Sequence, residues 1–106
     1  MIEEINAVDA AKLLGSDSGV LFLDVREHSE LAICRIEGAL HIPMGEIPES
    51  LAHLPKDRQM IVLCHHGMRS MHVAHFLQAQ GFQNILNLAG GIHAWAAHVD
   101  PNMAQY

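Results

Sequence analysis

Residues 60–80 constrain the fold of this chain more than any other stretch. Residues 60–63 read MIVL, a short apolar run with two adjacent β-branched residues, which is typical of a buried strand. After Ser70, apolar residues recur at the spacing of one helical face. Residues of that face are Met71, Val73, Ala74, Phe76 and Leu77, with Met68 one turn back. The sequence therefore predicts a strand, a tight loop and a helix, with Cys64 at the carboxyl end of the strand, where open α/β sheets carry their reactive groups.

The position of Cys64 favours a reactive thiol. A side chain between a strand end and a helix start faces backbone N–H groups and the positive end of the helix dipole, about half an elementary charge. Arg69 adds a full positive charge, and both effects favour the thiolate, which is the nucleophilic form. Gly67 lets the backbone turn left-handed or approach a ligand closely. The alternative is a packing role, because free cysteines are often buried, but the neighbouring residues favour catalysis.

Three stretches resemble the motifs of the rhodanese family of sulfurtransferases. Residues 64–70, CHHGMRS, resemble its active-site loop C-x-x-G-x-R-[ST]. Residues 23–26, LDVR, followed by Glu30 and by residues 38–43, GALHIP, resemble its amino-terminal motif. Residues 81–82, GF, residues 87–88, NL, and residues 90–95, GGIHAW, resemble its carboxyl-terminal motif G-G-[IVM]-x-x-W. Since the three occur in the family's order over about residues 3–98, the resemblance covers nearly the whole chain.

The resemblance implies a rhodanese-like α/β fold, with a mainly parallel central sheet and helices on both faces. The alternation of apolar runs and helical patterns indicates the same class. Expected strands are residues 2–5, 20–25, 38–42, 60–63 and 84–88. Expected helices are residues 7–14 with Asn6 as their cap, 27–33, 47–54 as a short helix or turn, the segment from Ser70 to Gly81, and a last helix that follows Gly90 and carries Trp95.

Length and composition fit one folded domain. The 106 residues suffice for a single core, half of them are hydrophobic, and 17% are charged. We expect a single domain over residues 1–106, with a core over about residues 3–98 and a loosely held tail over residues 100–106.

Charge and hydropathy exclude several partners. A net charge of −6 argues against nucleic acid, whose binding requires Lys and Arg to neutralise phosphates. No apolar run approaches the length of a membrane span, and the first ten residues carry two glutamates where a signal peptide has basic residues. We therefore expect no membrane partner and a cytoplasmic location, where a disulfide between Cys34 and Cys64 is not favoured.

The resemblance implies a thiosulfate sulfurtransferase that works without a cofactor. Cys64 would take a sulfur from a small anionic donor such as thiosulfate as a persulfide, and then pass it to cyanide, to a thiol or to a protein acceptor. The rest of the loop would bind the substrate. These residues are His65, His66, Gly67, Met68, Arg69 and Ser70.

Asp24 and Arg26 are expected to support the site rather than to react. Both lie at the carboxyl end of the predicted strand 20–25, the same edge of the sheet as Cys64. Carboxylates and guanidinium groups at strand ends often hold neighbouring loops by charge-assisted hydrogen bonds.

The nine histidines do not predict a metal site. His72 and His75 lie on the predicted helix beyond the loop, and no carboxylate completes a ligand motif with them. His65 and His66 lie within the loop, where they could bind substrate, help to set the thiolate, or only tune substrate preference. The sequence leaves these roles open.

Two other functions stay open: a non-enzymatic persulfide relay or regulatory module, and a phosphatase of the related cysteine-loop kind. Four residues separate Cys64 from Arg69, whereas the phosphatases that resemble this family have five, C-x5-R. The shorter loop favours sulfur over phosphate. Cys34 stands where rhodaneses commonly have glycine, in CRIEGA against G-H-I-x-G-A, and is either a buried apolar residue or a resolving thiol.

Overall fold

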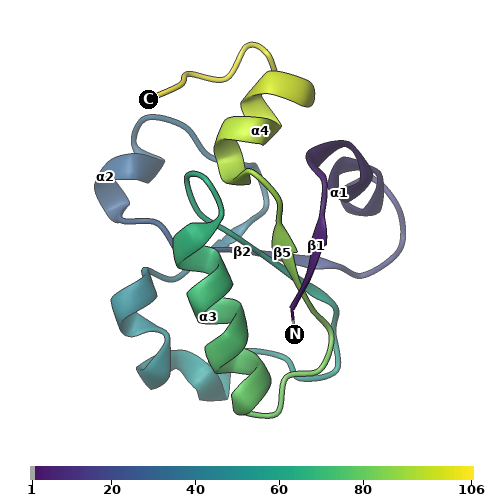
Figure 1. Ribbon diagram of the computed structural model, residues 1–106, viewed down its shortest axis with the longest axis vertical. Helices are drawn as coiled ribbons and strands as arrows, with labels where there is room; N and C mark the ends of the chain where they lie inside the picture. Colours follow the sequence, from purple (N-terminus) through teal and green to yellow (C-terminus); the bar gives the residue numbers. More distant parts are fainter. Residues whose placement is uncertain (1) are drawn as a thin grey trace.

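A five-stranded parallel sheet lies at the centre of the molecule (Figure 1), which is a computed structural model describing residues 2–106. The strands are β1 (Glu3–Ile5), β2 (Leu21–Asp24), β3 (Leu40–His41), β4 (Met60–Leu63) and β5 (Ile85–Leu88). Their order is β1-β5-β4-β2-β3, and each pairing described is parallel. The central strand, β4, therefore carries Cys64 at its carboxyl end, as the sequence predicts.

Parallel neighbours require crossover connections, which the helices supply. The α-helices are α1 (Ala7–Leu14), α2 (His28–Leu31), α3 (Met68–Ala79) and α4 (Gly91–His98). Two short 3₁₀ helices, η1 (Met44–Glu46) and η2 (Pro48–His53), connect β3 to β4. Among residues 2–106, no helix combines the length and hydropathy that crossing a membrane requires.

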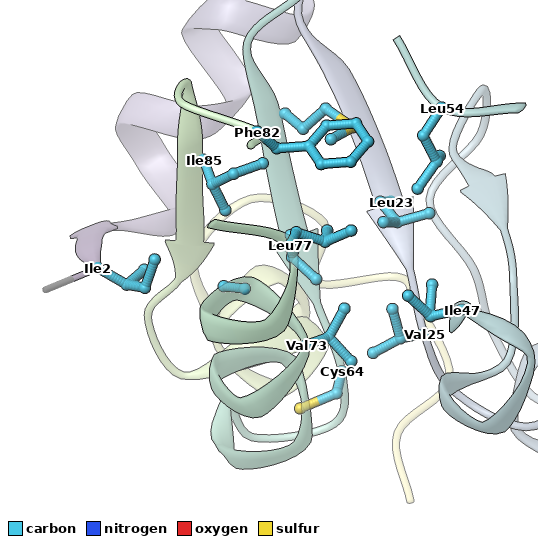
Figure 2. Packing of buried hydrophobic residues seen from close by; sticks show 13 residues of the cluster. Ile2, Leu23, Val25, Ile47, Leu54, Cys64, Val73, Leu77, Phe82 and Ile85 are labelled. Atoms are coloured by element: carbon cyan, nitrogen blue, oxygen red, sulfur yellow. The ribbon is translucent and has the colours of Figure 1, made fainter. Parts of the chain in front are cut away.

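The core is divided between the two faces of the sheet because side chains alternate along each strand. Met60 and Val62 of β4 belong to a cluster with α3, in which Val73 and Leu77 are buried (Figure 2). Ile61 and Leu63 belong to a second cluster, on the face covered by α1 and α4. The predicted α/β class, with helices on both faces of a parallel sheet, is confirmed.

Local signals account for most helix ends. The side chain of Asn6 accepts a hydrogen bond from the Asp9 amide at 2.8 Å, so α1 begins where the sequence predicts. Helix α3 begins at Met68, directly after Gly67, but Met68 itself is exposed and does not belong to the buried apolar face. Gly67 has φ of 110°, a conformation that other residues rarely adopt, and it reverses the chain within a short distance. Arg69 and Ser70 consequently lie in the first helical turn rather than in the loop.

The segment after α4 has no regular helix or strand, but several of its side chains make contacts. Met103 is half-buried and packs on the cluster beneath α4. Tyr106 lies against His65, 3.9 Å between ring centroids. Residues 100–106, which the sequence predicts to be a loosely held tail, thus contact the loop that follows Cys64 through Tyr106.

Candidate active site

Cys64 is the first residue after β4 and is 1% exposed. Its Sγ accepts a hydrogen bond from the Gly67 amide at 3.1 Å. The left-handed conformation of Gly67 lets the chain turn directly from this amide into the first turn of α3. Figure 2 shows Cys64 at the border of the apolar cluster, beside Val73 of α3. The thiol thus lies between an apolar core and a backbone N–H group that would stabilise negative charge on sulfur.

The start of α4 is joined directly to the backbone of the loop. The Ile92 amide donates a hydrogen bond to the Cys64 carbonyl at 2.9 Å, and the His93 amide donates to the His65 carbonyl at 3.0 Å. A Cβ atom at Gly91 would overlap both carbonyl groups, and the φ of Gly91 is +60°. Only glycine fits this approach, which explains the glycines of the GGIHAW stretch in physical terms.

A buried polar group holds the start of α3 from the side of β5. The amide nitrogen of Asn87 donates to the Gly67 carbonyl at 3.1 Å and to Glu4 at 3.0 Å. The hydroxyl of Ser70 donates to the carbonyl oxygen of the same Asn87 side chain. Ser70 and Asn87 are both fully buried. Ser70 is predicted to be part of the substrate-binding loop, but its hydroxyl binds Asn87 and so holds the start of α3 to the sheet.

Arg69 forms a two-pronged ion pair with Glu30 of α2. Its Nη1 and Nη2 atoms lie 2.7 and 2.8 Å from the two carboxylate oxygens. The hydrogen bond from Arg69 lowers the pKa of Glu30 to about 2, against the opposing effect of burial. The same hydrogen bond raises the pKa of Arg69. Since the guanidinium group has five N–H donors, this pairing leaves others for a substrate.

Asp24 and Arg26 form a buried ion pair at the carboxyl end of β2. The distance between Arg26 Nη2 and Asp24 Oδ2 is 2.7 Å. Burial, the largest single effect, disfavours the charge on Arg26, but the hydrogen bonds and charges of Asp24 and Tyr106 together outweigh it, and the pKa of Arg26 is raised. Arg26 also donates to the carbonyl of Cys34 at 2.9 Å and to that of Glu30 at 3.4 Å. The pair therefore fixes the segment that carries Glu30, and Glu30 in turn holds Arg69.

Tyr106 connects this ion-pair network to the loop. Its hydroxyl accepts from Arg26 at 3.0 Å and donates to Glu30 at 2.7 Å, while its ring stacks on His65 with an interplanar angle of 11°. Burial is the main cause that raises the pKa of Tyr106 to about 12. Burial, followed by the nearby His66, lowers the pKa of His65.

The structure brings most of the predicted site residues together, but in different roles. Cys64, His65, His66 and Gly67 form the loop, whereas Met68 is 76% exposed on the first turn of α3. His72 and His75 are exposed further along α3. Sequence reasoning gave no role to Glu30 or Asn87, although both lie in stretches that match the family motifs. It missed Tyr106 altogether, because no motif or periodicity marks that residue.

The chain is similar to known proteins over nearly its whole length. The family model described as "Rhodanese-like domain" matches residues 6–98. A sulfurtransferase of Allochromatium vinosum is 38% identical over 104 residues, which are 98% of this chain and 97% of the relative. The thiosulfate sulfurtransferase GlpE of Coxiella burnetii is 32% identical over 98 residues, 92% of this chain and 91% of that protein.

Solved structures give the same result for the fold. The crystal structure of a rhodanese-like domain protein from Staphylococcus aureus superposes with a TM-score of 0.86 at 30% identity, and covers 99% of both chains. Together with the family match over residues 6–98, this shows that the chain belongs to the rhodanese-like domain family.

Proposed function

We propose that this protein is a sulfurtransferase that moves a sulfane sulfur from an anionic donor such as thiosulfate to a nucleophilic acceptor through a persulfide on Cys64. The observation that carries the proposal is the position of the Cys64 sulfur, at the end of the central strand and 3.1 Å from the Gly67 amide. The names of relatives, a sulfurtransferase and a thiosulfate sulfurtransferase, support the same chemistry.

The reaction proceeds in two displacements at sulfur. In the first, the Cys64 thiolate attacks the outer sulfur of thiosulfate, a new S–S bond forms, and the S–S bond of the donor breaks to release sulfite with its electron pair. In the second, cyanide or a thiolate attacks the outer sulfur of the persulfide, and the Cys64 thiolate leaves. Neither step changes the number of electrons overall, so the cycle needs no cofactor and has ping-pong kinetics.

The surrounding residues supply positive potential for the donor and the bound sulfur. The Gly67 amide points at Sγ, and the start of α3 adds the positive end of a helix dipole. Arg69, held by Glu30, presents its remaining N–H groups to the anionic part of the donor. His65 and His66 flank the nucleophile and tune which donors and acceptors reach it.

The acceptor in the cell is proposed to be a thiol, either of a small molecule or of a protein. Both cysteines are free thiols in the structure, and the reducing cytoplasm would keep them in that form.

One comparison of substrates tests the reaction type. Purified protein is incubated with thiosulfate and cyanide, and separately with p-nitrophenyl phosphate. We expect thiocyanate from the first mixture and no phosphate release from the second, because the four residues between Cys64 and Arg69 form a ring too tight for a tetrahedral phosphate. Phosphate release without thiocyanate would show a phosphatase. Persulfide formation without turnover would show a relay module.

A further inference from the structure

Three histidine side chains from two elements converge beside the loop. His65 and His66 follow Cys64, and His93 lies in the first turn of α4. One ring nitrogen from each of the three lies within 4.8 Å of one from each of the others. Ring centroids are 3.9 Å apart for His65 and His66, and 5.1 Å apart for His66 and His93. Imidazole nitrogen is a preferred ligand of zinc and its neighbours in the transition series.

The backbones that carry these rings are held together. The His93 amide donates to the His65 carbonyl at 3.0 Å, and the adjacent Ile92 amide donates to the Cys64 carbonyl at 2.9 Å. The ring of His65 is also fixed by the stacked ring of Tyr106, at 3.9 Å. These contacts fix the backbones of the loop and of α4 relative to each other, and so hold the three imidazoles close together.

The spacing suits a tetrahedral ion. With Zn–N bonds of about 2.0–2.1 Å, two ligand nitrogens of a tetrahedral site lie roughly 3.3 Å apart. The ring nitrogens of the cluster lie within 4.8 Å of one another, so any two of them need to approach by about 1.5 Å at most to bind the ion. His66 and His93 are exposed, so rotation of their side chains supplies this movement without any change in the backbone.

We propose that His65, His66 and His93 form a binding site for a divalent transition-metal ion of the zinc class, with three imidazole ligands and an open fourth position. Three protein ligands with an open position are the arrangement of zinc sites that admit an exogenous ligand. The net charge of −6 favours cations over the whole molecule. Arg26 and Arg69, which belong to the ion-pair network around Tyr106, are already paired with carboxylates.

This inference departs from the expectation, drawn from the sequence, that the chain has no metal site. That expectation compared His65 and His66 with His72 and His75, which lie along α3. The third ligand instead comes from α4, which the fold brings to the loop through the close approach of Gly91. Spacing along the chain does not reveal such a set.

Cobalt binding to the untagged, metal-free protein tests the site, since Co²⁺ replaces Zn²⁺ in such sites and absorbs visible light. Matched variants are His93→Ala, which removes the ligand from α4, and His98→Ala, which removes an exposed histidine from the last turn of the same helix. A third variant, Cys64→Ser, removes the nearby thiol. Zn²⁺ is then added as a competitor, and circular dichroism checks the fold of each variant.

We expect wild type, His98→Ala and Cys64→Ser to bind one equivalent of Co²⁺ that Zn²⁺ displaces. His93→Ala should weaken binding at least about tenfold. The proposal is overturned if the wild type does not bind Co²⁺ or if His93→Ala binds Co²⁺ as tightly as the wild type does. It is equally overturned if His98→Ala loses as much Co²⁺ affinity as His93→Ala. It is also overturned if Cys64→Ser abolishes binding, which would make the thiol the ligand. Because Cys64→Ser is inactive in the proposed sulfur transfer, the two functions are tested separately.

Discussion

Arg69 reaches from the first turn of α3 to Glu30 of α2 and binds both of its carboxylate oxygens, at 2.7 and 2.8 Å. The two residues are 39 positions apart in the sequence. Glu30 also accepts from the Tyr106 hydroxyl at 2.7 Å. Glu30 therefore orients Arg69, the arginine expected to bind the donor, before any donor arrives. The sequence marks Glu30 only as part of a motif.

Replacing Glu30 by glutamine should change how stability depends on pH. The pKa of Glu30 is lowered from 4.5 to about 2 in the folded protein. The unfolded state therefore binds more protons between these values, so the stabilisation by ionised Glu30 is fully present above about 4.5 and is lost as the pH falls towards 2. Urea unfolding of wild type and Glu30→Gln should give a difference in free energy that shrinks as the pH falls through this window. A difference that stays constant with pH would contradict it.

Replacing Gly91 by alanine should damage both stability and activity. The new Cβ atom would overlap the carbonyls of Cys64 and His65, and φ at this position is +60°. We expect a loss of more than about 2 kcal/mol in the free energy of unfolding, and a large loss of sulfur transfer, because α4 and the loop are pushed apart. Gly45→Ala is the control, since its Cβ meets nothing within 4 Å. Equal behaviour of the two variants would refute this explanation of Gly91.

Replacing Trp95 by alanine should remove a large part of the second core cluster. Trp95 is 5% exposed and makes a T-shaped contact with Phe22, 5.6 Å between ring centroids. Truncation of a buried tryptophan costs about 3–5 kcal/mol of unfolding free energy. The exposed Val8→Ala should stay within about 0.5 kcal/mol of wild type in the same urea titration. A cost below about 1 kcal/mol for Trp95→Ala would mean that this packing does not hold α4 in place.

Replacing Cys34 by alanine should preserve most of the turnover. Cys34 is half-buried, and its Sγ is 4.0 Å from Arg26 Nη1. The strong contact with Arg26 is made by the Cys34 carbonyl, at 2.9 Å, and alanine keeps that group. Steady-state thiocyanate production measures the result. A large loss in a folded variant, together with a Cys34–Cys64 disulfide trapped in the wild type, would instead identify a resolving thiol.

Local signals predicted much of the fold. Residues 60–63 form β4 and residues 7–14 form α1 as expected, because a short β-branched run and a capped apolar pattern each act over neighbouring residues. The expected helix starts at Ser70, whereas α3 starts at Met68, because the left-handed turn at Gly67 decides where the helix begins.

The site was less predictable because its contacts join distant segments. The sequence located Cys64 and the loop, but the pairing of Arg69 with Glu30 and the position of Asn87 depend on which strands are neighbours. The stacking of Tyr106 on His65 joins residues far apart in the chain, and no periodicity encodes it.

The mass of the intact protein after incubation with thiosulfate tests the central claim most directly. If Cys64 carries the sulfur, the wild type and Cys34→Ala should each gain about 32 Da, the mass of one sulfur atom on the activated thiol, and cyanide should remove it. Cys64→Ser should gain nothing. The same gain, in equal yield, on Cys64→Ser would contradict the account, because the sulfur would then be carried elsewhere.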